Sequence, residues 1–352
     1  MKVLIAAAML VVAAAASTPP WHLQDSGTLE RLRSVSAVSA SVAWASGSRG
    51  TVVRTEDGGR TWVGLSVQDA AALDFRDIEA IDARTAYVLS IGAGDRSRIY
   101  KTTNGGMSWM LQFANADPRA FYDAIAFWDE NDGLAVGDPV DGRFTILRTT
   151  DGGRTWALTP RDAQPAALPG DGMFAASGTC LVVRGHHNAW LATGGSARAR
   201  VFRSTDQGRT WYDADTPVAA GSASAGIFSI AFRDSTHGLV VGGDYRKEQE
   251  PSDNAARTDD GGKSWTLAGT SRLRGFRSAV VFMPRSKGRD LIAVGPSGSD
   301  LSRDAGATWT SLGDLGFDAV SVDRAGDAVW AVGERGRIGR LEPSELPGSG
   351  TK

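Results

Sequence analysis

The sequence of 352 residues contains few residues of the types that usually bind metals. It has one cysteine, Cys180, and four histidines. A single thiol cannot form an intramolecular disulfide, so the core alone must stabilise the fold. Cys180 stands in an apolar run, residues 179–183, which favours a buried strand residue over a nucleophile. His186 and His187 have no cysteine or carboxylate cluster beside them and are interpreted as turn residues. We therefore expect no metal site.

The sequence also lacks an excess of charge of one sign and lacks nucleotide-binding motifs. The formal net charge is −2 at pH 7, which argues against a polyanion binder and predicts no nucleic-acid partner. Helical patterns are nearly missing, and no Gly-x-Gly-x-x-Gly stands at a strand-to-helix turn. Gly92 and Gly94 lie between two expected strands and lack the third glycine. We therefore expect no cofactor.

Long apolar runs are absent except at the N-terminus. Lys2 precedes an apolar stretch, residues 3–16, that ends in three alanines. The run is shorter than the ~20 residues that span a bilayer, and no cysteine follows that could carry a lipid. We interpret residues 1–16 as a signal peptide, which predicts a periplasmic or secreted protein without a transmembrane segment after cleavage. An uncleaved N-terminal anchor is the alternative.

Glycine is abundant, with 43 residues, and much of it belongs to a motif that occurs six times. Each copy reads Ser/Thr-x-Asp/Asn-x-Gly-x-Thr/Ser-Trp, and consecutive tryptophans stand 44 to 55 residues apart, as four-stranded propeller blades require. The Asp or Asn can accept hydrogen bonds from the backbone that follows, and glycine supplies positive φ. The motif therefore predicts a turn between the third and fourth strands of each blade. Its structural residues are Asp57, Asn104, Asp151, Asp206, Asp260 and Asp304.

The remaining pattern predicts how many blades there are. Short apolar runs bounded by glycine indicate buried strands, and the innermost strands are expected to begin at residues 32, 75, 121, 174, 228, 276 and 317. The seventh unit has no motif after it, whereas Trp21 precedes Trp62 by 41 residues. We therefore expect the segment at Trp21 to supply the outer strand of the seventh blade. This predicts an all-β, seven-bladed propeller over residues 17–342 and a flexible tail over 343–352.

Candidate binding residues come from the face away from the repeated turns, where the loops vary. Arg33, Arg76 and Arg277 occupy the second position of three inner strands, and Tyr122 takes that position in a fourth, so they should surround the channel mouth. The loops after second strands add Asp138, Asp141, Arg143, Asp244, Tyr245, Arg246, Arg335 and Arg337. Such arginines could bind carboxylates or an acidic peptide through bidentate pairs. Alternatively, they are solvated or form internal ion pairs.

The six motif copies match the consensus of the Asp-box, or bacterial neuraminidase repeat, and Asn104 is the only departure at the Asp position. This resemblance covers nearly all of the mature chain. With seven blades in one domain, the chain is most similar to the photosystem II stability and assembly factor propellers and their bacterial relatives. The resemblance implies an exported, non-enzymatic scaffold that binds a protein or peptide partner in the envelope, and we expect a monomer.

A glycoside hydrolase is the alternative function. Sialidases with this repeat carry an early Phe/Tyr-Arg-Ile-Pro signature, and neither residues 32–35 nor residues 75–78 continue to proline. Xyloglucan hydrolases place paired carboxylates between two propellers, whereas one propeller is expected here. Asp138 or Asp141 could still pair with Asp244 across the face that carries the variable loops. We assign no catalytic residue.

Overall fold

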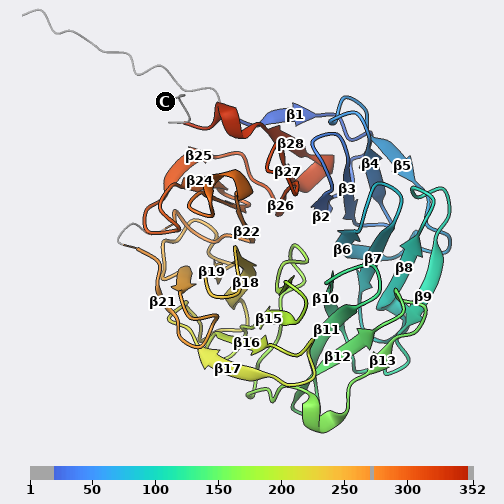
Figure 1. Cartoon of the computed structure of the whole chain (residues 1–352), viewed down its shortest axis with the longest axis vertical. Helices are drawn as coiled ribbons and strands as arrows, with labels where there is room; N and C mark the ends of the chain where they lie inside the picture. The colour runs from blue at the N-terminus through green and yellow to red at the C-terminus, as the bar shows by residue number, and fades with distance from the viewer. Residues whose placement is uncertain (1–19, 270–272, 348–352) are drawn as a thin grey trace, which may run out of the picture.

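The computed structural model describes residues 20–269 and 273–347, which form seven four-stranded antiparallel sheets arranged in a ring (Figure 1). The prediction of an all-β, seven-bladed propeller is therefore confirmed. Residues 1–16, interpreted as a signal peptide, lie outside the described residues. In the described part of the chain, no helix has the length and apolarity needed to cross a membrane.

Blades 1 to 6 each consist of four consecutive strands, which follow one another from the central channel outward. Blade 1 contains β2 (Leu32–Ala37), β3 (Ala43–Gly47), β4 (Val52–Thr55) and β5 (Val63–Leu65). Blade 2 contains β6 (Asp74–Ala80), β7 (Ala86–Ile91), β8 (Arg98–Thr102) and β9 (Met110–Ala114). Blade 3 contains β10 (Tyr122–Phe127), β11 (Gly133–Val140), β12 (Arg143–Thr149) and β13 (Ala157–Leu158).

The second half of the ring repeats this order. Blade 4 contains β14 (Leu181–Arg184), β15 (Asn188–Ala192), β16 (Arg200–Ser204) and β17 (Tyr212–Asp215). Blade 5 contains β18 (Ala225–Phe232), β19 (Gly238–Asp244), β20 (Ala255–Thr258) and β21 (Thr266–Leu267). Blade 6 contains β22 (Ala279–Phe282), β23 (Leu291–Gly295), β24 (Gly298–Ser302) and β25 (Thr310–Gly313). The short 3-10 turns are η1 (Gly94–Arg96), η2 (Arg161–Ala163), η3 (Pro284–Ser286), η4 (Glu334–Gly336) and η5 (Pro343–Glu345).

Blade 7 joins the two ends of the chain. Its strands β26 (Ala319–Val322), β27 (Val329–Val332) and β28 (Ile338–Leu341) are completed by β1 (His22–Gln24), which pairs antiparallel with β28 (Figure 1). Trp21, just before β1, is buried, and its ring lies 5.0 Å from that of Phe317. Gln24 accepts a hydrogen bond from Trp62 Nε1 of blade 1 at 2.9 Å. The predicted closure of the ring near Trp21 is confirmed, and β1 covers the edge that β28 would otherwise expose.

Each of the six motif copies forms the same hydrogen-bonded turn. In the first copy, Asp57 Oδ1 accepts from Thr61 N at 2.9 Å and Oδ2 accepts from Thr61 Oγ1 at 2.7 Å, while Thr55 Oγ1 accepts from Gly59 N at 2.9 Å. In the second copy, the amide nitrogen of Asn104 takes the place of the Oδ2 acceptor and instead donates to Ser108 Oγ at 2.8 Å. The repeat is thus a turn that satisfies its own polar groups.

The hydrophobic core is divided among the blade interfaces. In the described part of the chain, seven clusters of buried apolar side chains occur, one between each pair of neighbouring blades. Trp44 of β3, for example, packs edge-on against Trp109 of blade 2 with ring centroids 6.2 Å apart. Because both faces of the inner strands are buried, these strands read as short, almost continuously apolar runs.

Two expectations about the course of the chain need correction. The inner strand of blade 4 begins at Leu181 rather than at 174, because residues 159–180 form a long connection before the strand. The tail is ordered further than expected, since Pro343–Glu345 forms η5 and Leu346 is buried in the core of blade 7. Residues 348–352 lie outside the described residues.

The antiparallel order gives the propeller two distinct faces. The turn face carries the repeat turns and the hairpins between first and second strands. The loop face carries the loops between second and third strands and the connections between blades. The longest loop between second and third strands follows β19, as expected, but the connection of residues 159–180 is longer.

Candidate binding site at the loop-face mouth of the channel

Bulges in the inner strands define the candidate site. The pairing of the first and second strands shifts by one residue at Arg33, Arg76, Asp123 and Phe228, so each of these residues has no partner on the neighbouring strand. All four line one pocket of about 480 Å³ at the loop-face end of the channel. Ser278 and Asp318, which directly precede β22 and β26, line it too. Bulges re-aim side chains in this way next to many functional sites. We call this cavity the loop-face pocket.

One side of the loop-face pocket is cationic. Arg31 is held by Asp318 through two hydrogen bonds of 2.7 Å. Arg76 Nε donates to Asp74 Oδ2 at 2.8 Å, and its Nη1 donates to the carbonyl of Ala175 at 2.9 Å. Arg31 Nη1 also lies 3.2 Å from Glu334 Oε1, so these contacts fix both guanidinium groups, while Arg76 Nη2 has no partner among the described residues.

Arg33 is the least compensated cation of the group. Its side chain is 13% exposed, its closest carboxylate oxygen, on Asp318, is 3.7 Å away, and its Nε is buried with no hydrogen-bond partner among the described residues. Burial lowers the pKa of Arg33 to about 10, against the opposing attraction of Asp318. A buried guanidinium with an open donor stabilises a negatively charged group that comes within reach.

Another side of the pocket is aromatic. The rings of Phe174 and Phe228 stack 3.8 Å apart and nearly parallel, and Tyr245 meets both edge-on at 6.4 and 6.1 Å. Phe276 lies edge-on to Phe228 at 4.6 Å. Phe174 belongs to the long connection before β14, so this connection supplies part of the wall. The arrangement offers an apolar surface that an aliphatic or aromatic side chain could cover.

Two carboxyl groups line the pocket between these sides. Burial raises the pKa of Asp123 well above its usual range, and the negative charge of Asp138 raises it further. Burial likewise raises the pKa of Asp138, although its Oδ1 accepts a hydrogen bond from Met173 N at 2.9 Å. Both groups therefore hold a proton at higher pH than a free carboxyl group does. No cluster of metal-ligating side chains occurs in the described part of the chain.

The structure brings four of the predicted binding residues together. Arg33, Arg76, Asp138 and Tyr245 all line the loop-face pocket.

Arg277 and Tyr122 do not line it, because the residue that faces the pocket is the next one along the chain, Ser278 and Asp123 respectively. Arg277 is fully buried and donates from Nε to Asp300 Oδ2 at 2.7 Å, while Ser278 takes the pocket position. Tyr122 is buried against Phe113, with ring centroids 5.5 Å apart.

The other predicted residues lie on the loop face outside this pocket. Asp141 pairs with Arg119 at 3.0 Å, and Arg143 Nη1 donates to the carbonyl of Gln164 at 2.6 Å. Asp244 accepts from the backbone N–H of Arg246 at 3.0 Å and so closes its own turn.

The last two predicted arginines follow β27. Arg335 is exposed in η4 with a φ of 55°, and Arg337 Nη1 donates to the carbonyl of Gly316 at 2.6 Å. Of the four loop arginines, Arg143 and Arg337 donate to backbone carbonyls, whereas Arg246 and Arg335 are exposed.

Sequence reasoning missed several lining residues: Arg31, Phe121, Asp123, Phe174, Phe228, Glu248, Phe276 and Asp318. One signal was available for Phe174, since the spacing of 55 residues from Trp156 to Trp211 shows that extra chain lies between the two motifs. Nothing comparable marked Asp123, because a bulge leaves no trace in the apolar pattern of its strand, or Asp318, which precedes its strand.

Comparison with known proteins identifies similar folds. No protein-family model and no curated protein matches the sequence. A solved structure described as "YCF48 bound to D1 peptide" has a TM-score of 0.66 at 17% identity, over 93% of this chain and 98% of that one. YCF48 from Cyanidioschyzon merolae has a TM-score of 0.64 at 17% identity, over 93% and 99%.

Glycosidase propellers are similar too. The GH74 xyloglucanase from Xanthomonas campestris has a TM-score of 0.63 at 15% identity, over 94% of this chain but 55% of that one. The likeness to both kinds of protein at these identities establishes the fold alone: a seven-bladed propeller that is the whole of one relative and about half of the other.

Proposed function

We propose that the protein binds a peptide segment of another protein in the loop-face pocket. A carboxylate of the peptide pairs with Arg33 and Arg76, and a neighbouring apolar side chain packs on Phe174 and Tyr245. The observation that carries this proposal is that a cationic and an aromatic surface line the same 480 Å³ pocket. The structural likeness to a propeller with a bound peptide supports the choice of ligand class.

The chemistry of the pocket favours a charged and partly apolar ligand. A hydrogen bond that involves a charged group contributes about 1.5–3 kcal/mol, and the closest carboxylate oxygen to Arg33 is 3.7 Å away, which leaves its charge weakly paired. The stacked rings of Phe174 and Phe228 add an apolar surface that a carboxylate alone would leave uncovered. An acidic peptide with a hydrophobic side chain satisfies both surfaces at once.

We also propose that the protein acts outside the cytoplasm, on the basis of the apolar leader in residues 1–16. Cell fractionation of the full chain would detect it in the periplasm or medium. Recovery in the cytoplasm alone would contradict this.

Fluorescence polarisation with short labelled peptides tests the binding proposal. One peptide carries Phe and Leu beside two Glu, a second has Gln for Glu, and a third has Ser for Phe and Leu. We expect the first to bind best and its Kd to rise at least tenfold in the Arg33→Gln/Arg76→Gln variant.

Arg96→Gln is the matched control for the arginine variant. Arg96 is an exposed arginine of the same face that does not line the pocket. Its removal should leave peptide affinity unchanged. Equal affinity of wild type and the double variant, with both folded by circular dichroism, would contradict the site.

A glycoside hydrolase is the second candidate function, and the buried carboxyl groups of Asp123 and Asp138 favour it. A carboxyl group with a raised pKa can act as a general acid beside a second carboxylate. The other carboxylates considered from the sequence have internal partners: Asp141 pairs with Arg119, and Asp244 accepts from the backbone of its own turn. Turnover of xyloglucan oligosaccharides that is lost in Asp138→Asn would establish this function, and absence of turnover would remove it.

A further inference from the structure

The opposite mouth of the channel holds a second cavity. A pocket of about 600 Å³ lies on the turn face, where the inner strands of blades 4 to 7 end. Its charged lining consists of Arg184, Arg233, Asp234, Lys287, Asp323 and Arg324, and its apolar lining includes Phe282, Met283 and Val322. We call it the turn-face pocket. Four cations against two carboxylates give this lining an excess of positive charge.

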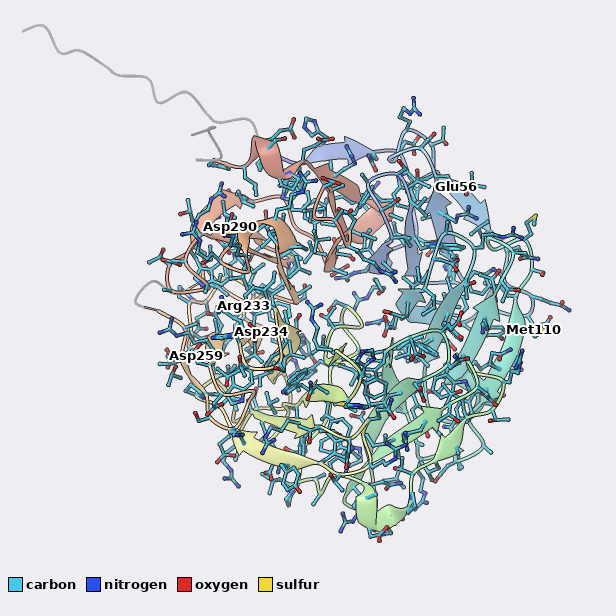
Figure 2. All side chains as sticks on the ribbon, in the orientation of Figure 1. Glu56, Met110, Arg233, Asp234, Asp259 and Asp290 are labelled. Atoms are coloured by element: carbon cyan, nitrogen blue, oxygen red, sulfur yellow. The ribbon has the colours of Figure 1, made fainter. Side chains whose placement is uncertain are left out.

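The two carboxylates of the turn-face pocket are already occupied. Asp234 lies beside Arg233 (Figure 2) and accepts hydrogen bonds at 2.8 Å from the backbone N–H groups of Thr236 and His237. Although burial opposes it, these N–H groups hold the pKa of Asp234 well below its usual range. Asp323 is buried and accepts from the backbone N–H of Asp327 at 2.6 Å and of Ala328 at 2.7 Å. Both carboxylates are thus committed to their own turns.

The cations are less constrained. Arg184 uses Nε to donate to the carbonyl of Phe232 at 2.7 Å, and Arg324 uses Nη2 to donate to the carbonyl of Ile81 at 2.9 Å. The remaining guanidinium nitrogens of both, and the ammonium group of Lys287, have no hydrogen-bond partner among the described residues. Burial lowers the pKa of Arg184, against the opposing attraction of Asp234.

We propose that the turn-face pocket binds the phosphate group of a small organic phosphate. Cations from blades 4, 6 and 7 converge on one cavity, and a tetrahedral group with more than one negative charge can accept hydrogen bonds from all of them. A volume of about 600 Å³ is within the range of small-molecule sites, and the apolar lining can contact the rest of the ligand. This site is independent of peptide binding at the loop face.

Isothermal titration calorimetry with inorganic pyrophosphate tests the site. We expect saturable binding at one site per chain, with a Kd that rises at least tenfold in Lys287→Asn. Lys287 has no side-chain partner among the described residues and a φ of 54°, a conformation that asparagine tolerates, so this substitution should not disturb folding. Arg154→Gln removes an exposed arginine of the same face that does not line the pocket and should leave Kd unchanged.

Further titrations separate a phosphate site from general anion attraction. Arg184→Gln/Arg324→Gln should weaken pyrophosphate binding at least tenfold, and glycerol phosphate should compete with pyrophosphate. Citrate at matched ionic strength should compete weakly. Absence of saturable binding, unchanged affinity in both pocket variants, or equal binding of citrate would each overturn the proposal. The Arg33→Gln/Arg76→Gln variant should bind pyrophosphate like wild type, which distinguishes this result from that of the loop-face experiment.

Discussion

The two faces of the propeller use the same strands in different ways. At the loop face, bulged residues and the long connection of residues 159–180 form a pocket whose arginines mostly have carboxylate partners. At the turn face, the carboxylates accept from their own turns, Asp234 also pairs with Arg233 at 3.3 Å, and Arg184, Lys287 and Arg324 have no carboxylate within 4 Å among the described residues. The comparison shows that cations stay free to bind a ligand where the nearby carboxylates already accept hydrogen bonds from their own turns.

Regularity also differs between the faces. The repeat turns on the turn face are nearly identical, since each Asp or Asn accepts from the Ser or Thr four residues later. The loop face is irregular, with loops of unequal length and bulges in several inner strands. The repeated turns therefore stabilise the fold, whereas the candidate binding residues lie where the chain departs from the repeat, in the loops and bulges.

Asp77, between the two faces, should have the largest effect on how stability depends on pH. It accepts from Ile125 N at 2.8 Å, and burial raises its pKa to about 7. Its ordinary value is about 4, so the folded state keeps a proton that the unfolded chain has already lost. Stability should therefore fall as pH rises from about 4 to 7, by a few kcal/mol at about 1.4 kcal/mol per unit. Urea unfolding at several pH values measures this.

Asp77→Asn should make the decline between pH 5 and 7 measurably smaller but should not abolish it, because burial also raises the pKa values of Glu79, Asp123 and Asp138. Asp57→Asn, on the turn face, should leave the decline as it is in wild type. A decline of the same size in Asp77→Asn would show that this carboxyl group does not titrate as its burial implies.

Asp171 tests whether the long connection builds the loop-face pocket. Its carboxylate, fully buried, pairs with buried Arg200 and accepts from Leu168 N at 2.8 Å. Asp171→Ala should cost about 3 kcal/mol, because it leaves a buried charge poorly paired. It should also weaken peptide binding by displacing Phe174, and should leave pyrophosphate binding intact. Chemical denaturation and both binding assays give these values.

Asp215→Ala serves as the control for Asp171→Ala. Asp215 pairs with Arg198 at 2.6 Å, but both side chains are about half exposed. Such pairs contribute less than about 1 kcal/mol. A large loss in Asp215→Ala, or an intact peptide site in Asp171→Ala, would remove the link between the connection and the pocket.

Gly58 tests the turn face. It has a φ of 76°, which costs a residue with a side chain about 1 kcal/mol, although a Cβ there would meet nothing closer than 3.4 Å. Gly58→Ala should therefore lower the free energy of unfolding by about 1 kcal/mol without affecting either binding site. Gly64→Ala, in exposed β5 with open space around the new Cβ, should not destabilise. Equal losses in the two variants would show that φ is not the cause.

Asp57→Asn should have the smallest effect at neutral pH. Asn104 already forms this turn with an amide, so thermal unfolding at pH 7 should be almost unchanged. The backbone and hydroxyl groups of Thr61 lower the pKa of Asp57 to about 2. The stabilisation from this carboxylate is present above about pH 4 and is lost as pH falls towards 2. Asp57→Asn should therefore lose less stability than wild type between pH 4 and 2, and an equal loss would contradict this.

The repeat, its turns, the number of blades and the closure of the ring near Trp21 could all be predicted from the amino-acid sequence. These features are local or periodic: a hydrogen-bonded turn needs only neighbouring residues, and a missing motif in a regular series is visible by counting. Four pocket residues were also found, because Arg33, Arg76, Asp138 and Tyr245 recur at strand and loop positions that point to one face.

Which of the remaining residues lie together depends on the three-dimensional fold. Neighbouring residues can end up in different places: Ser278 lines the loop-face pocket, whereas Arg277 is buried and bonded to Asp300. Phe174 reaches the pocket by stacking on another blade, and Arg184, Lys287 and Arg324 converge from three blades. Strand register and packing between distant segments depend on the whole ring, so no local pattern in the sequence encodes them.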